Sequence, residues 1–252
     1  GGMVPTALSN PRRRSPGSVS ETVQTASRTW RAVPPMWREL LLIAVFYSAY
    51  TLTRLVLNDG GTAVAFQNAY EILALERTLG IDIELSLNQA LLQASWLALS
   101  ANYFYGIAHF AVTLIVLVWL YRFRSRHYRW LRTALMAATA AALVGFWLYP
   151  LAPPRFLTGE GFVDPVQALG SWGLYSGQSA GTLTNQYAAM PSMHAGWALW
   201  CGFALVLLGG RSWVKAIGAL YPAVTVLVII ATANHYVVDA VVGVCLVAER
   251  CC

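Results

Sequence analysis

The sequence predicts an all-α fold, a polytopic membrane helix bundle with six transmembrane helices and with the N and C termini in the cytoplasm. Hydrophobic residues make up 57% of the 252 residues and charged residues only 11%, whereas a soluble domain carries about 25% charged residues. The ten Trp and twelve Tyr residues suit a protein with two membrane–water interfaces to occupy. The composition therefore excludes an ordinary soluble protein, a disordered chain and a secreted disulfide scaffold.

Apolar segments divide most of the chain into candidate spans. A helix needs about 20 apolar residues to cross roughly 30 Å of hydrocarbon. The candidates are residues 38–57, 100–121, 131–149, 192–209 and 213–233, with a shorter one at 235–249. Residues 62–94 are amphipathic and too charged to span, so we expect them to lie along the membrane interface. Residues 35–250 thus form one membrane domain, and the polar residues 1–34 are expected to be a disordered cytoplasmic tail.

The positions of the basic residues predict the orientation of these helices. Fourteen of the 17 Lys and Arg residues fall on one face, in the tail, the 122–132 loop, the 210–215 turn and the C-terminal end. Because cytoplasmic loops are enriched in Lys and Arg, we expect that face to be cytoplasmic. The 150–191 loop is then extracytoplasmic. Scattered between apolar spans, these basic residues do not favour a nucleic-acid partner.

Two polar motifs on the extracytoplasmic face suit the binding of a phosphate. The third span ends in Tyr149-Pro150-Leu151-Ala152-Pro153-Pro154-Arg155, where prolines stop the helix and hold Arg155 near the membrane surface. The fourth span opens with Pro191-Ser192-Met193-His194. Ser192 and His194 are therefore expected at a helix N-terminus, whose free amides and dipole favour an anion.

A third motif, Asn234-His235-Tyr236-Val237-Val238-Asp239, opens the last span. We expect Asn234 to be the N-cap of that helix, and His235 and Asp239 to share one helix face. A carboxylate that holds one imidazole nitrogen makes the other a better nucleophile or base. A second histidine, His194, is available as a general acid. Together with an anion cradle, these groups favour phosphoryl transfer.

Other interpretations of the same residues remain open. A metal site built from His194, His235 and Asp239 lacks a firm second carboxylate, so the chemistry is expected to be metal-independent. His109, in the second span, is expected to pack or to line a cavity rather than to take part. A non-enzymatic lipid carrier or transporter would predict inverted repeats or paired broken helices, and the sequence shows neither.

The three motifs resemble those of the type 2 phosphatidic acid phosphatase (PAP2) superfamily. The resemblance covers residues 149–239, and the flanking spans by topology. It implies that His235 attacks phosphorus and forms a phosphohistidine, that Asp239 orients His235, and that His194 protonates the leaving group without a cofactor. It also implies that Arg155 and Ser192 bind the phosphate. Further candidates for the pocket are Gln186, Tyr187, Asn234 and Tyr236.

Two departures from the superfamily pattern bear on the substrate. This chain has Leu148 where the first motif has a lysine, and Val228-Ile229 where the third usually has Ser-Arg. The pattern is similar to the inositol-phosphorylceramide and sphingomyelin synthase branch, whose members move phosphoryl head groups between lipids. A single arginine suits a singly charged phosphodiester better than a phosphomonoester. Head-group transfer is therefore the leading expectation, with hydrolysis of phosphatidic acid or a polyprenyl phosphate as the alternative.

The length of the last span predicts where the site lies. From His235 to Ala248 the chain has 14 residues, or ~21 Å of helix, against ~30 Å of hydrocarbon. We therefore expect His235 to be recessed below the outer surface, with His194 and Arg155 within reach of one phosphate. The expected partners are a lipid substrate from the bilayer and the membrane itself, most simply the plasma membrane. The oligomeric state is left open.

Overall fold

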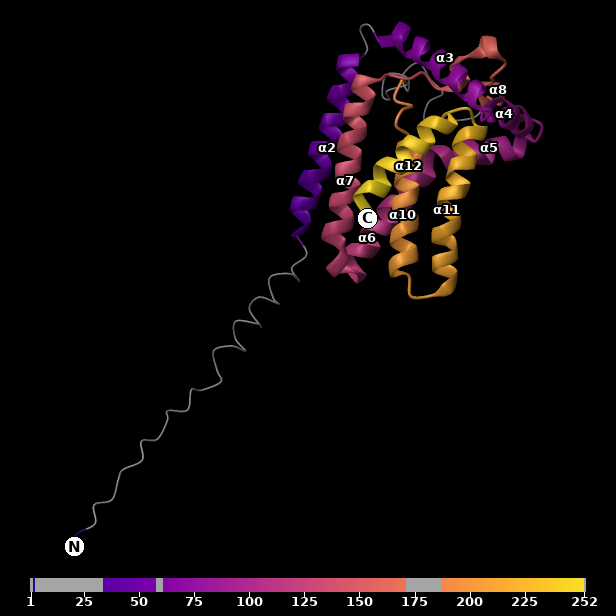
Figure 1. The fold of residues 1–252 in the computed structure, drawn as a ribbon. Coiled ribbons are helices and arrows are strands. Elements are labelled where there is room, and N and C mark those ends of the chain that lie inside the picture. Colours follow the sequence, from indigo (N-terminus) through magenta and orange to yellow (C-terminus); the bar gives the residue numbers. More distant parts are fainter. Residues whose placement is uncertain (1, 3–33, 58–60, 171–186, 252) are drawn as a thin grey trace.

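The computed structural model describes residues 2, 34–57, 61–170 and 187–251 (Figure 1). Within these residues every regular element is a helix, which confirms the all-α prediction. The expected N-terminal tail lies almost entirely outside the described residues. Residues 171–186 of the predicted 150–191 loop also lie outside them.

Among the described residues, three helical segments are long and apolar enough to cross a membrane. They are Ser95–Phe123, α7 (Ser125–Leu148) and α11 (Ser212–Ala231). The first of these comprises α5 (Ser95–Tyr103), a π-helical turn η1 (Phe104–Ala108) and α6 (His109–Phe123). The apolar α10 (Met193–Leu208) and α12 (Val237–Cys251) are shorter, at 16 and 15 residues, whereas α2 (Met36–Leu57) has 22 residues. Three of the six expected spans therefore have the length and hydropathy of a membrane span.

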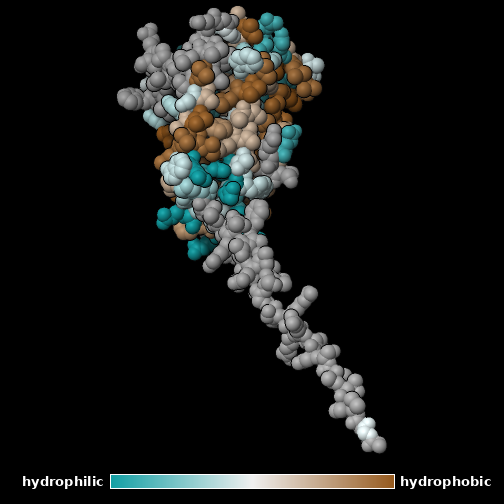
Figure 2. All heavy atoms as spheres, turned by 90° about the vertical axis from the view of Figure 1, so that its left-hand side faces the viewer, coloured by the Kyte–Doolittle hydropathy of each residue, from teal (hydrophilic) through white to brown (hydrophobic). Residues whose placement is uncertain are grey.

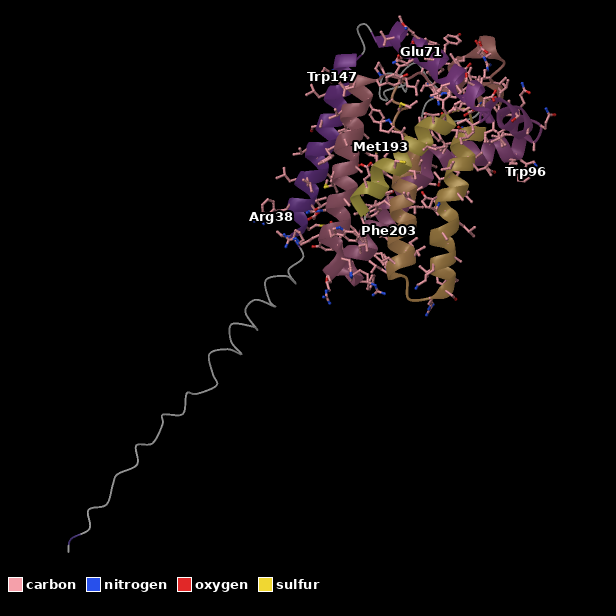
Figure 3. The ribbon with its side chains drawn as sticks, in the orientation of Figure 1. Arg38, Glu71, Trp96, Trp147, Met193 and Phe203 are labelled. Carbon is pink, nitrogen blue, oxygen red and sulfur yellow. The ribbon has the colours of Figure 1, made fainter. Side chains whose placement is uncertain are left out.

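The surface of the bundle fits an apolar surrounding. Hydrophobic residues form a broad band across the face shown in Figure 2, and hydrophilic residues gather below it, where the chain leads into α2. In Figure 3, Arg38 and Trp147 mark opposite ends of the pair formed by α2 and α7.

This pair is held by the buried Glu39, which accepts hydrogen bonds from Arg132 at 2.5 Å and from Tyr128 at 2.8 Å. The charge of Glu39 is thus paired rather than exposed.

Residues 62–94 fold into two helices, α3 (Gly61–Leu79) and α4 (Glu84–Leu92), across one end of the bundle (Figure 1). The sequence predicts one amphipathic stretch here; the structure divides it into two helices, and polar residues of both are buried. Asn68 donates to the carbonyl of Pro150 at 2.8 Å. Asn88 donates to the carbonyls of Val163 and Ala231 at 3.1 and 3.2 Å. The two helices therefore tie the loop after α7 to the end of α11.

Close packing of α10 against α12 brings two of the predicted motifs together. A Cβ at Gly243 would lie 2.1 Å from the carbonyl oxygen of Ser192, and one at Gly196 would lie 3.0 Å from the carbonyl oxygen of Gly243. At position 243 only glycine permits this approach, and at position 196 a side chain would be tightly crowded. The backbone N–H of Ser192 donates to the carbonyl of Asp239 at 3.1 Å. The start of α10 is thus held against the first turn of α12.

Candidate active site

His235 and Asp239 form a buried pair at the start of α12. The Nδ1 atom of His235 lies 3.1 Å from Oδ1 of Asp239, and the side chains are 4% and 0% exposed. A carboxylate only accepts hydrogen bonds, so Nδ1 carries the proton and Nε2 presents its lone pair. The arrangement thus leaves Nε2 as the nucleophilic or basic atom of His235.

The structure corrects the predicted N-cap of this helix. Asn234 does not cap α12, because the helix begins at Val237, and the Asn234 side chain donates to Oγ1 of Thr232 at 2.8 Å. Ala233 has a positive φ of 54°, so the chain turns sharply before His235. The capping acceptor is instead Asp239, whose Oδ2 accepts the backbone N–H of Tyr236 at 3.0 Å.

His194, in the first turn of α10, lies directly beside His235. Its Nδ1 atom is 3.4 Å from Nε2 of His235, so the two imidazoles meet on the side of His235 that faces away from Asp239. Tyr105 stacks on His194 with ring centroids 4.3 Å apart and an interplanar angle of 16°. The Nε2 atom of His194 is buried and has no hydrogen-bond partner among the described residues.

His109 belongs to this cluster as well. Its ring centroid is 3.9 Å from that of His194, and its Nδ1–H donates to the carbonyl of Tyr105 at 3.0 Å. The hydrogen bond spans the π-helical turn of residues 104–108, a distortion that often occurs at functional sites. The sequence predicts a packing or cavity residue here, and the structure places that residue against the predicted acid.

Ser192 caps α10. Its Oγ accepts the backbone N–H of Ala195 at 3.3 Å, and the residue is fully buried. The hydroxyl hydrogen remains available to a bound anion, because only the oxygen is used by the cap. The predicted phosphate ligand thus lies at a helix N-terminus, as the sequence indicates, two residues before His194.

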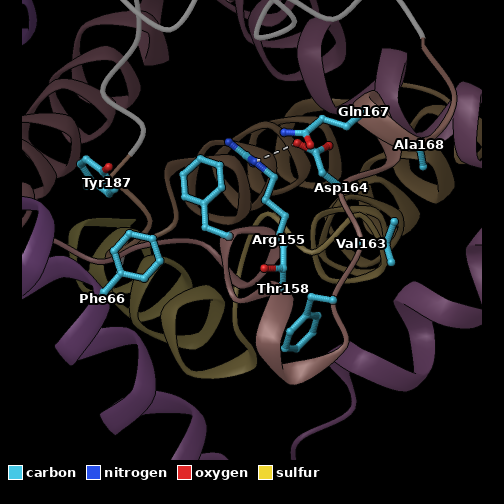
Figure 4. Close-up of a pocket in the computed structure, with 10 residues that line it drawn as sticks. Phe66, Arg155, Thr158, Val163, Asp164, Gln167, Ala168 and Tyr187 are labelled. Carbon is cyan, nitrogen blue, oxygen red and sulfur yellow. Dashed lines mark ion pairs between the residues drawn. The ribbon is translucent and has the colours of Figure 1, made fainter.

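Arg155 lines a cavity of about 690 Å³ (Figure 4). Its backbone N–H donates to the carbonyl of Ala233 at 2.8 Å, which fixes it two residues from His235. Its Nε is 3.8 Å from Oδ2 of Asp164. Figure 4 shows Gln167 beside Asp164. The cavity is lined by Phe66, Arg155, Phe156, Thr158, Phe162, Val163, Asp164, Gln167, Ala168 and Tyr187.

The structure therefore joins most of the predicted site. His235 contacts both His194 and Asp239. The backbone N–H of Ser192 donates to the carbonyl of Asp239, and that of Arg155 donates to the carbonyl of Ala233. Of the four further candidates for the pocket, Tyr187 lines the cavity over Arg155 and Gln186 lies outside the described residues. Asn234 and Tyr236 are buried. The hydroxyl of Tyr236 donates to the carbonyl of Ala152 at 3.1 Å.

Sequence reasoning missed two buried carboxyls, Glu76 of α3 and Glu84 of α4, which contact the start of α12. A signal for Glu76 was present. It follows Ala65, Ala69 and Ile72 at helical spacing, and so lies on the apolar face of α3. An acid on an apolar helix face indicates a buried partner, since a carboxylate is rarely buried unpaired.

Comparison with known proteins supports the resemblance drawn from the motifs. The sequence profile described as the PAP2 superfamily matches residues 70–250. No curated protein and no solved structure matches the chain. Because the profile covers well over half of the sequence, the chain belongs to the PAP2 superfamily. Membership and the apolar helices together support an integral membrane enzyme of the phosphatase or phosphotransferase type.

Proposed function

We propose that the protein is a metal-independent phosphoryl-transfer enzyme that acts on lipid head groups through a phosphohistidine at His235. The observation that carries this proposal is the chain of contacts from Asp239 to His235 to His194, at 3.1 and 3.4 Å. Asp239 fixes the tautomer that leaves Nε2 of His235 unprotonated, and His194 lies where a leaving group would receive a proton.

In the proposed first step, Nε2 of His235 attacks phosphorus as the bond from phosphorus to the leaving oxygen breaks. That oxygen takes a proton from His194. In the second step an acceptor hydroxyl attacks the phosphohistidine, the phosphorus–nitrogen bond breaks, and the hydroxyl proton passes to His194. Both histidines are then restored. Arg155 and Ser192 are assigned to the phosphoryl oxygens, because a guanidinium and a helix N-terminus both favour an anion.

The nature of the acceptor separates transfer from hydrolysis. If the acceptor is a lipid alcohol, the head group moves to a second lipid, and if it is water, the lipid is hydrolysed. We favour transfer from a phosphodiester lipid. Arg155 is the cation that the described part of the site provides, and a diester brings a single negative charge. Transfer of this kind is also what the inositol-phosphorylceramide and sphingomyelin synthase branch performs.

The proposed setting is a bundle of six spans with both termini in the cytoplasm and the site on the extracytoplasmic face of the plasma membrane. The helix α2 and the shorter helices α10 and α12 would complete the six. The sequence predicts a basic loop at 122–132, but α6 ends at Phe123 and α7 begins at Ser125, so most of these residues are helical. Their five arginines still lie at the end of α7 opposite the Arg155 segment, and they support this orientation under the positive-inside rule.

The direct test is lipid mass spectrometry on the purified protein. It would be incubated with phosphatidic acid, polyprenyl phosphates and phosphatidylinositol, with and without added lipid alcohol. Transfer gives a new phosphodiester lipid that requires the alcohol, whereas hydrolysis gives the dephosphorylated lipid in its absence. Unchanged lipids under all conditions would contradict an enzymatic function and favour a lipid-binding protein.

The assignment of His194 as the acid predicts a dependence on the leaving group. Replacing His194 with Ala should lower the rate on a lipid substrate by about 10²–10⁴-fold, the usual worth of general acid catalysis. A p-nitrophenyl ester, whose leaving group needs no proton, should lose far less. The ratio of the two rates within one preparation cancels any loss of folded protein. Equal losses on both substrates would argue against the acid role.

Metal independence predicts that turnover survives chelation. Among the described residues, no group of three or more His, Cys, Asp or Glu side chains is placed to hold a metal ion. Excess EDTA should therefore leave the rate within about twofold of the untreated enzyme, since no step requires a Lewis acid. A loss on chelation that Zn²⁺ or Mg²⁺ restores would instead show a metallohydrolase.

A further inference from the structure

Two buried carboxyls outside the histidine cluster contact the first turn of α12. Oε1 of Glu84 accepts the backbone N–H of Val237 at 2.8 Å, and Oε1 of Glu76 accepts that of Val238 at 2.7 Å. Both glutamates are 0% exposed. With Asp239, which accepts the N–H of Tyr236, three carboxyls satisfy three successive amides that the helix itself leaves without acceptors.

The remaining oxygens of the two glutamates need a proton. Oε2 of Glu76 and Oε2 of Glu84 are buried and have no donor among the described residues. The side chains of Glu76 and Glu84 are also within hydrogen-bonding contact of each other. Two carboxylates in such contact cannot both stay ionised in a buried site. Burial raises the pKa of Glu76 to about 9, and the hydrogen-bonding contact with Glu84 acts in the same direction. One proton between the two Oε2 atoms satisfies both.

We infer that Glu76 and Glu84 are positioning residues that share one proton and together anchor the start of α12, and with it His235 and Asp239. Each glutamate uses one oxygen for a backbone amide and the other for its partner. The pair holds the peptide units immediately after His235 and so fixes where the imidazole lies relative to His194. It also limits the buried negative charge beside Asp239 to one unit rather than two.

This inference deepens the proposed function, because it gives the fixed geometry of His235 a physical source. α3 and α4 lie across the end of the bundle (Figure 1), so the anchor links the segment between α2 and α5 to α12. A catalytic side chain must be held within about 0.5 Å of its productive position. Neither glutamate is assigned any contact with the substrate.

A double-substitution cycle tests the shared proton. In Glu76→Gln the amide oxygen can accept the N–H of Val238 while the amide nitrogen donates to Oε2 of Glu84, which reproduces the protonated state. Glu84→Gln does the same from the other side. In the double variant two NH₂ groups face each other, and neither finds an acceptor. Each single variant should therefore be tolerated, and the double variant should be defective well beyond the sum of the two.

The first readout is thermal unfolding in detergent. We expect each single variant within about 2 °C of the wild type and the double variant lower by about 3–10 °C, since a buried unsatisfied donor is costly and this chain is large. The exposed Glu71 of α3 supplies the control, because Glu71→Gln should change nothing. If the losses in melting temperature of the two single variants add up to that of the double variant, the shared proton is overturned. It is also overturned if each single variant loses as much as the double variant, a result that would indicate two required charges or a bound cation.

The second readout is hydrogen exchange of the backbone amides of Val237 and Val238, whose N–H groups the two glutamates accept. These should stay protected in both single variants and lose protection at least tenfold in the double variant. Unchanged protection in the double variant would overturn the anchoring role. If the enzyme turns over a lipid, kcat should fall about tenfold or more in the double variant with KM little changed. A wild-type protein inactive on every lipid would contradict the proposed function, while melting and exchange would still decide the carboxyl pair.

Discussion

Replacing His235 with Asn should abolish phosphoryl transfer while leaving the bundle folded. The proposed covalent intermediate forms on Nε2 of His235, an atom that asparagine lacks. We expect a loss on the order of 10⁵-fold or more in kcat, as for the loss of a nucleophile elsewhere. Asparagine is preferred to alanine because its amide can still donate to Asp239, so that the buried carboxylate is not left without its partner.

The measurement is the rate on the lipid substrate, together with rapid-quench trapping of a phosphorylated protein. The wild type should yield a phosphoprotein that is labile in acid and stable in base, as a phosphohistidine is, and His235→Asn should yield none. His127 lies in the first turn of α7, at the end of the helix that is far from the Arg155 segment. It gives the matched control, since His127→Asn should keep full activity. A wild-type rate in His235→Asn would end the covalent mechanism.

The histidine cluster was predictable because its motifs lie at helix starts. Apolar periodicity places each motif at the beginning of a span, and the alternation of spans brings those beginnings to one end of the bundle. The i, i+4 spacing of His235 and Asp239 allows their contact from local geometry alone. The contact of His194 with His235 also depends on the close approach of α10 and α12, which Gly196 and Gly243 permit.

What the sequence could not predict depends on packing between distant helices. Glutamate is a residue type that is usually found at the surface. Only the fold shows that the apolar face of α3, which carries Glu76, covers the start of α12. Asn234 has the residue type of a good N-cap, which would start the helix at His235. Carboxyls from α3, α4 and α12 instead accept the amides of residues 236–238, and the helix begins two residues later, at Val237. His109 contacts His194 because η1 and α10 are neighbours in space, which periodicity does not reveal.

Replacing Asp239 with Asn should lower kcat by about 10⁴-fold, through the tautomer of His235 rather than through unfolding. The two oxygens of Asp239 accept two hydrogen bonds, one from Nδ1 of His235 and one from the N–H of Tyr236. Asparagine has one oxygen and one NH₂ group, so it can accept only one of them. If its oxygen keeps the N–H of Tyr236, its NH₂ faces Nδ1 of His235 and favours the lone pair there.

The proton of His235 then moves to Nε2, the atom that must attack phosphorus, and the nucleophile is blocked. The phosphate ligands Arg155 and Ser192 are unchanged, so KM should stay within about threefold while kcat falls. Asp82, exposed in the turn between α3 and α4, supplies the matched control, and Asp82→Asn should retain full activity. The steady-state constants and the melting temperature in detergent would be compared for both variants. A kcat within tenfold of the wild type in Asp239→Asn would show that the carboxylate does not set the tautomer, and the proposed role of Asp239 would have to be abandoned even if His235 proved to be the nucleophile.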